Sequence, residues 1–137
     1  MEESKAKDIY VNSIPIMLDK ERHIKYTFGA YGWLARKHGS VVAATKPLSD
    51  SENMKMLTTK SMGIIADLVY AGLLWEDENL DRDSIDDKET GKNKDRQRIT
   101  DLLDFSELPK VIEIISQAIN NSVPQGVSSD PTATPAV

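Results

Sequence analysis

The 137-residue sequence contains no cysteine, which excludes disulfide bonds, thiolate metal sites and thiol nucleophiles. It also has no long hydrophobic run. The longest nearly apolar stretch, residues 62–75, is interrupted by Asp67 and is shorter than the roughly 20 residues that cross a membrane. The charged start, residues 1–5, is not followed by the apolar run of a signal peptide. We therefore expect no contact with a membrane and a reducing, cytoplasmic location.

An excess of positive charge is also missing, since the net charge is −5. Proteins that bind nucleic acid usually carry a basic stripe, so we expect no binding to DNA or RNA. Two short basic stretches, residues 36–38 and 92–98, are interpreted as solvated surface. Hydrophobic residues make up 39% of the chain, which indicates that part of it lies outside the core.

Candidate catalytic residues are scarce. The sequence has two histidines, His23 on the expected exposed face of a hairpin and His38 at the end of a helix. Neither has a nucleophile at a suitable spacing, and a histidine at a helix C-terminus is explained by the helix dipole. The pair Gly29 and Gly32 lacks the lysine of a phosphate-binding loop and is expected to let a helix pack closely on the hairpin.

The acidic cluster that begins at Asp81 superficially resembles a calcium-binding loop. Such a loop needs glycine at its sixth position and glutamate at its twelfth, but the sequence has Asp86 and Lys92 there. We therefore interpret the cluster as a solvated, mobile loop. With no metal site, no cofactor site and no catalytic set in the sequence, we expect that the protein is not an enzyme.

The N-terminal third predicts a β-hairpin followed by a helix. Apolar residues alternate with others on both sides of a charged turn at residues 19–21, as in a hairpin with one face on a core. These apolar residues are Ile14, Ile16, Leu18, Ile24, Tyr26 and Phe28. A bulge or break is expected near Asn12, and Pro15 predicts an edge strand. A helix should then run from residue 29 to a glycine cap at Gly39.

The remainder predicts mainly helices. Residues 40–50 form a loop with a short strand or helical turn, and the longest helix runs from about residue 51 or 55 to 75, with a break near Thr58. Further helices are expected over residues 97–105 and, capped by Ser106 with Pro109 in its first turn, to about residue 119. The fold class is therefore α+β, with an N-terminal β-hairpin packed on a mainly α-helical bundle. We expect a flexible N-terminus (1–8), one domain (9–120, with a mobile loop over about 77–96) and a disordered tail (121–137).

The second half of the longest helix, residues 64–75, is apolar on nearly every face and must be covered all round. In so small a chain it is either the central helix of the domain or partly covered by another subunit. Tryptophan and tyrosine are core residues by default, but they are also enriched at protein-binding hot spots. The candidate partner-binding residues are Trp33, Tyr70, Leu73, Leu74 and Trp75.

Three segments together resemble the tail assembly chaperones of long-tailed bacteriophages. The first is the hairpin of residues 14–28, with Leu-Asp and Lys-Glu at its turn, and the second is the Ala-Gly-Leu-Leu element of residues 71–74 followed by acids. The third is the final amphipathic helix that begins Leu-Pro-Lys-Val at residue 108. The resemblance covers roughly residues 12–120 in the same order.

The resemblance implies a non-virion assembly factor in the host cytoplasm. Proteins of that family bind the tape measure protein, keep it soluble and help to recruit tail tube protein, often as a short form and a longer, frameshifted form. Weak self-association would cover an apolar binding surface when it is idle. The alternatives are a structural tail completion or connector component of the virion, a small enzyme or regulatory subunit, and a domain that binds peptides at the Pro15 edge.

Overall fold

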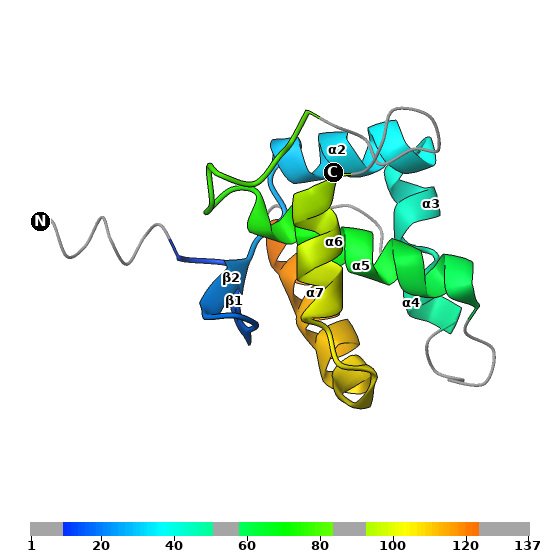
Figure 1. Ribbon diagram of the computed structural model, residues 1–137. Coiled ribbons are helices and arrows are strands. Elements are labelled where there is room, and N and C mark those ends of the chain that lie inside the picture. Colours follow the sequence, from blue (N-terminus) through cyan, green and yellow to red (C-terminus); the bar gives the residue numbers. More distant parts are fainter. Residues whose placement is uncertain (1–9, 51–57, 84–92, 124–137) are drawn as a thin grey trace, which may run out of the picture.

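The computed structural model describes residues 10–50, 58–83 and 93–123 (Figure 1). The expected flexible N-terminus, residues 84–92 of the expected mobile loop (77–96) and nearly all of the expected tail lie outside these residues. The two ends of that loop are structured, so the expectation of mobility is wrong for them: Leu80 and Asn93 are buried, and a helix begins at Lys94. Within them, a two-stranded hairpin is followed by a series of helices. In chain order these are β1 (Ile14–Met17), β2 (Glu21–Ile24), α2 (Phe28–His38), α3 (Val41–Thr45), α4 (Pro47–Asp50), α5 (Thr59–Leu73), α6 (Lys94–Asp101), the 3₁₀ turn η2 (Phe105–Glu107) and α7 (Leu108–Ser122).

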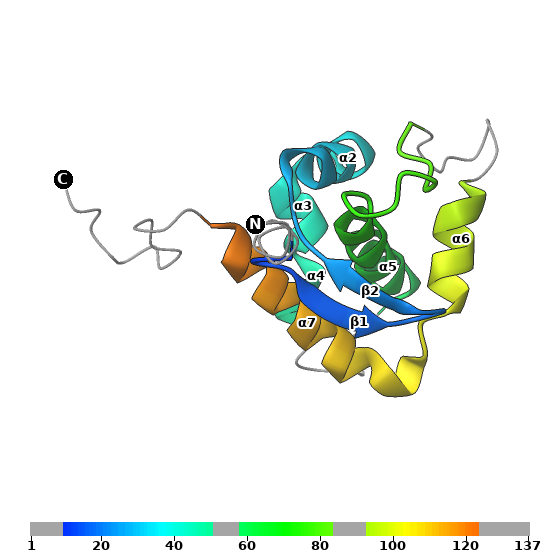
Figure 2. The ribbon, with the colours of Figure 1, turned by 90° about the vertical axis from the view of Figure 1, so that its left-hand side faces the viewer.

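The two strands pair antiparallel and lie against the helices, with α7 running along β1 (Figure 2). Ile14 is opposite Ile24 in this register, so the alternation in the sequence does place apolar side chains on one face. Asn12 has φ of 69°, a left-handed turn residue at the position of the predicted break. The expectation for Phe28 is wrong: it starts α2, and its side chain is 97% exposed.

Helix α2 has the ends that its sequence predicts. The Thr27 side chain accepts a hydrogen bond from the backbone N–H of Ala30, and Gly39 ends the helix at φ of 89° with its N–H donating to the carbonyl of Ala35. The next segment is helical rather than a loop or strand. Ser40 caps α3, and Pro47 occupies the first position of α4, where proline is favoured.

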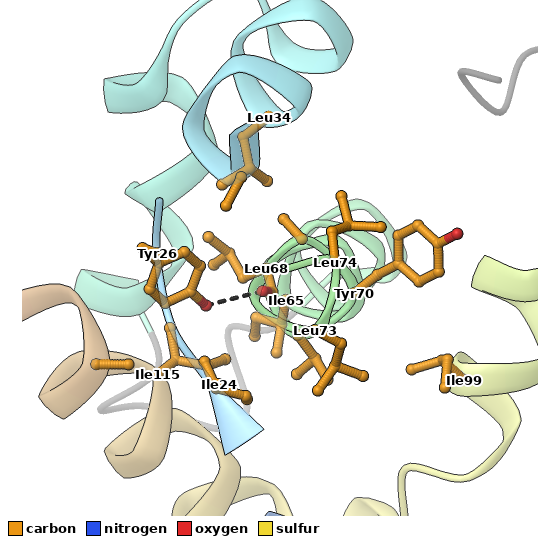
Figure 3. Packing of buried hydrophobic residues seen from close by; sticks show 14 of the residues in the cluster. Ile24, Tyr26, Leu34, Ile65, Leu68, Tyr70, Leu73, Leu74, Ile99 and Ile115 are labelled. Carbon is orange, nitrogen blue, oxygen red and sulfur yellow. Dashed lines mark hydrogen bonds between the residues drawn. The ribbon is translucent and has the colours of Figure 1, made fainter. Parts of the chain in front are cut away.

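Helix α5 lies at the centre of the molecule. Thr58 caps it by accepting from the N–H of Ser61, which agrees with the break predicted there. Figure 3 shows α5 nearly end-on, with Leu34 of α2 on one side, Ile24 of β2 with Ile115 of α7 on another and Ile99 of α6 on a third. The chain therefore covers this apolar helix by itself. Of the two alternatives, the structure therefore supports the central helix of the domain rather than a helix partly covered by another subunit.

The hairpin approaches α5 closely at Gly72. A methyl group built at Gly72 would lie 2.6 Å from Cγ2 of Ile24, so only glycine fits here. The Lys25 N–H donates to the Gly72 carbonyl at 3.0 Å, and the Tyr26 hydroxyl donates to the Leu68 carbonyl at 2.8 Å. The glycines expected to permit this packing were Gly29 and Gly32, but a Cβ at Gly29 would meet only Oγ1 of Thr27, at an ordinary 3.6 Å, and a Cβ at Gly32 would meet no atom within 4 Å. That expectation is wrong.

The last helices differ from the prediction at both ends. Asn93 caps α6 by accepting from the N–H of Arg96, so α6 starts at Lys94, three residues before the predicted start, and it ends at Asp101, four residues before the predicted end. Asp104, rather than Ser106, provides the next cap, because its side chain accepts from the Ser106 N–H and starts η2. Pro109 lies in the first turn of α7 as predicted. The buried face of α7 comprises Leu108, Val111, Ile114, Ile115 and Ala118.

The fold is α+β, with an N-terminal hairpin packed on helices, as the sequence predicts. None of the helices in the described ranges has both the length and the apolarity that a bilayer crossing requires.

Candidate functional site

Four of the five predicted partner-binding residues are core residues. The side chains of Trp33, Tyr70, Leu73 and Leu74 are 1%, 0%, 1% and 3% exposed. The Tyr70 hydroxyl donates to the Asp81 carbonyl at 2.6 Å, and burial raises the pKa of Tyr70 to about 12. These four side chains have almost no surface to offer a partner, so the structure does not support them as a binding surface.

Trp75, the fifth predicted residue, is half-buried at the end of α5 and fixes that end to the hairpin. Its indole N–H donates to the His23 carbonyl at 2.9 Å, and the Lys25 ammonium lies 5.1 Å from the centre of its ring. The ring of Tyr10 lies edge-on at 5.9 Å. Trp75 therefore belongs to an aromatic contact with the hairpin, whereas Trp33 pairs with the Tyr70 ring at 5.3 Å.

Asp67 is the polar residue within the apolar helix, and it is buried. Its carboxylate accepts from the Lys37 ammonium at 2.9 Å and from Nε of Arg96 at 2.7 Å, and it contacts Nε2 of His38 at 2.8 Å. A buried carboxylate is tolerated only with such partners. The cluster joins α2, α5 and α6, so the position of His38 has a structural cause beyond the helix dipole.

A second ionic cluster closes the hairpin against the end of α5. The buried guanidinium of Arg22 donates to Asp19 at 2.8 Å and to Asp77 at 2.9 Å. The hydrogen bond from Arg22 lowers the pKa of Asp19 to about 2 and also lowers the pKa of Asp77. His23, expected on an exposed face, is instead half-buried, with Nδ1 at 2.7 Å from Glu76. The Asp67 cluster thus joins three helices, and the Arg22 cluster joins the hairpin to the segment that follows α5.

An apolar groove opens beside the first turns of α5, where α6 ends and α7 begins. It has a volume of about 450 Å³ and an apolar floor, and two of its side chains stand largely exposed at its rim: Met62, 42% exposed, and Phe105, 54% exposed. We call it the Phe105 groove. Its apolar lining residues are Met62, Ile65, Ala66, Leu103, Phe105, Leu108 and Val111.

A second hollow of about 340 Å³ adjoins this groove, because both are lined by Leu103, Asp104 and Val111. It lies between β1 and the start of α7, and the exposed Met17 forms part of its β1 side. Apolar surface therefore runs from Met62 of α5 past the α6–α7 connection to the hairpin. Isolated exposed apolar residues are normal, but a contiguous set of them marks a surface for a partner.

The polar groups in the groove are already used in the fold. The Arg96 guanidinium donates to Asp67 and to the Gly63 carbonyl, and Asp104 caps η2. Over residues 10–50, 58–83 and 93–123, no three His, Asp or Glu side chains are placed to hold a metal ion. The groove therefore offers apolar contact rather than acid–base chemistry.

The sequence analysis did not find the Phe105 groove. Its rim residues Met62 and Phe105 are far apart in the chain and belong to different elements, so only the fold brings them together. The available signal was an aromatic residue, Phe105, in the connection between two amphipathic helices, where no core position requires it.

Comparison of the chain with family models, with curated proteins and with solved structures gives no match. The assignment of a function therefore depends on the geometry of the groove and on the resemblance in the sequence.

Proposed function

We propose that this protein is a phage tail assembly chaperone in the host cytoplasm, which binds an apolar helical segment of the tape measure protein, keeps it soluble and helps to recruit tail tube protein. The observation that carries the proposal is the Phe105 groove, with Met62 and Phe105 exposed at its rim. Amphipathic helices bind in such grooves through apolar side chains spaced along one face. The buried residues in the C-terminal half of α5, Tyr70 and Leu73 among them, take no part.

The size and the chemistry of the groove suit a helix. Its volume of about 450 Å³ lies in the range that accepts a few apolar side chains. Its floor is built by α5 and α7, whose Ile65, Leu108 and Val111 belong to the core and give the groove a fixed shape. The adjoining hollow beside Met17 extends the apolar surface, so that a partner helix longer than two turns would stay in contact with it.

The charge of the chain suits the same role. A chaperone with an apolar client must keep the complex in solution, and a net charge of −5 opposes association between complexes. The border of the groove carries charges of both signs, with Arg96 and Asp104 in its lining and Glu107 and Lys110 in the adjoining hollow. The apolar contact, rather than the charge at the border, therefore selects the client.

The test is co-expression of the chain with a tape measure polypeptide, followed by measurement of the soluble fraction of the client. We expect the native chain to keep the client soluble and Phe105→Glu to abolish this, because a charge at the rim must be desolvated when an apolar helix binds. Phe28→Glu is the matched control, since Phe28 is 97% exposed and outside the groove. It should solubilise the client like the native chain.

Two results would overturn the proposal. One is a client that stays insoluble with the native chain; the other is equal solubilisation by the native chain and by Phe105→Glu. Mass spectrometry of purified virions separates the chaperone from the structural alternative, a tail completion or connector component. A chaperone is absent from mature particles, whereas a connector is present at a fixed copy number.

A further inference from the structure

The charge of the chain is divided unevenly along the sequence. Residues 23–66 contain six Lys or Arg and only two Asp or Glu, whereas the rest of the chain contains eleven and twenty. No acidic residue occurs between His23 and Ser49. This segment forms α2, α3, α4 and the first half of α5, so the acidic protein has a basic side.

A pocket lies on this basic side, between the end of α2, α3, the start of α4 and the first turns of α5. It has a volume of about 470 Å³ and is lined by three lysines and a histidine, with a few short or apolar neighbours. We call it the basic pocket. Its lining residues are Lys37, His38, Ala43, Lys46, Pro47, Lys60, Ser61 and Ile64.

The nearby acids do not neutralise the basic pocket. The helices around the pocket, α2 to α5, contain two acids: Asp50 at the end of α4, and Asp67 in α5, whose carboxylate both Lys37 and Arg96 already contact. The four cations Lys37, Lys46, Lys60 and Arg96 exceed these two acids by two charges. Among the side chains that the structure describes, which do not include that of Asp50, none forms an ion pair with Lys46 or Lys60. A surplus of positive charge is therefore concentrated around one hollow.

The start of α5 adds to this potential. A helix of 15 residues has a partial positive charge at its N-terminus, where acidic residues are usually favoured. The first turn of α5 has no acid and contains Lys60 instead. The ammonium and the helix end repel each other, and an anion between them would relieve that repulsion.

We propose that the basic pocket binds a small oxyanion with at least two negative charges, the chemistry of a phosphate or pyrophosphate group. Lysine ammonium groups bind phosphate oxygens as mobile point charges, and at the start of α5 the Lys60 N–H can donate to the same oxygens, because the Thr58 cap takes the neighbouring N–H of Ser61. The described residues that line the pocket include no Phe, Tyr or Trp ring on which a base could stack, and the imidazole of His38 is held by the Asp67 carboxylate. The site therefore recognises the charged group itself.

This site is independent of the proposed chaperone function. The basic pocket uses Lys60, Ser61 and Ile64 of α5, whereas the Phe105 groove uses Thr59, Met62, Gly63 and Ala66. Residues at these spacings occupy different faces of one helix. Occupation of one site leaves the other accessible, so the two proposals fail or succeed separately.

The experiment is a titration of the ¹⁵N-labelled full chain with sodium pyrophosphate, compared with sodium chloride at equal ionic strength. We expect saturable shifts at the Lys60 and Ser61 amides with pyrophosphate only. The double variant Lys46→Gln with Lys60→Gln should weaken binding by about tenfold or more, because two charge-assisted contacts are lost. Lys20→Gln with Lys94→Gln is the matched control: it changes the net charge equally at two exposed lysines outside the pocket.

The control variant should bind pyrophosphate with an affinity within about twofold of that of the native chain, because screened charges far from a site contribute little. Phe105→Glu should also keep its affinity for pyrophosphate. The proposal is overturned if the shifts follow ionic strength alone, or if the double variant, shown by its amide spectrum to be folded, binds like the native chain.

Discussion

The two halves of helix α5 differ in what covers them. Its C-terminal half, around Leu68 and Leu73, is enclosed by the hairpin, α2, α6 and α7. Its N-terminal half has one flank open to the Phe105 groove, where Met62 is exposed. The more apolar half is therefore structural, and the less apolar half carries the candidate binding surface. An apolar segment shows that something must cover it but does not show which chain does.

Small residues explain how the closed half is covered. Ala71 is buried and Gly72 lets the hairpin approach within contact distance, so neighbours pack against the helix backbone itself. At the other end, α6 stops at Asp101 and α7 starts at Leu108. The connection between them lies beside Met62 and leaves the groove open.

Among side-chain truncations, the largest expected effect is at Asp67, which separates the two halves. Asp67→Ala leaves Lys37 and Arg96 in a partly buried site without their counter-charge, and should lower the free energy of unfolding by about 3–5 kcal/mol. Urea denaturation followed by circular dichroism measures the change. A loss below about 1 kcal/mol would show that the cluster is solvated and does not hold α2, α5 and α6 together.

Truncation of one apolar side chain in each half compares them directly. Leu68→Ala removes a fully buried side chain from the closed half and should cost about 2–5 kcal/mol. Met62→Ala, at the exposed rim of the groove, should cost less than about 1 kcal/mol. Urea denaturation again measures the free energies of unfolding. Equal losses for Leu68→Ala and Met62→Ala would contradict the difference between the halves.

A pair of glycine substitutions tests the close approach of the hairpin. Gly72→Ala places a methyl group 2.6 Å from Ile24 and should cost about 1–3 kcal/mol. Gly32→Ala is the control within another helix; it meets no atom within 4 Å and should stabilise the protein by about 0.5–1 kcal/mol. Thermal unfolding should show opposite signs for the two variants.

The smallest expected effect concerns pH and the ion pairs that close the hairpin on the end of α5. Arg22 lowers the pKa of Asp19 from 3.8 to about 2 and lowers that of Asp77 from the same value. A lowered folded-state pKa gives stability that is complete above the unfolded pKa and is lost as the pH falls through the folded one. The free energy of unfolding should therefore decrease between about pH 4 and pH 2. In Arg22→Met this part of the decrease should disappear, and an unchanged slope would contradict the assignment.

Local patterns predicted the local structure. The hairpin follows from period-two alternation, and α2 follows from its basic last turn and the glycine cap at Gly39. The α+β class follows from the same signals. Helix starts were less accurate, because Asn93 and Asp104 compete as caps with the residues chosen from the sequence.

The candidate site could not be predicted in the same way. Met62 and Phe105 meet only after α5, α6 and α7 have packed, and the partners of Asp67 come from helices on either side of it in the chain. Arg22 was given no role from the sequence, although its spacing from Ile24 places both on the inner face of the hairpin. For Asp67 in α5 and for Arg22 in the hairpin, the available signal was the same: a charged residue on an otherwise apolar face indicates a buried ion pair.

The most direct measurement compares the free energies of unfolding of Leu74→Glu and Phe105→Glu in urea. Leu74 is 3% exposed inside the closed half, so a glutamate there should abolish cooperative folding. Phe105→Glu, at the rim of the groove, should unfold within about 0.5 kcal/mol of the native chain. If Leu74→Glu instead folds with native stability, the end of α5 is an exposed surface and the division between a closed core and an open groove is wrong.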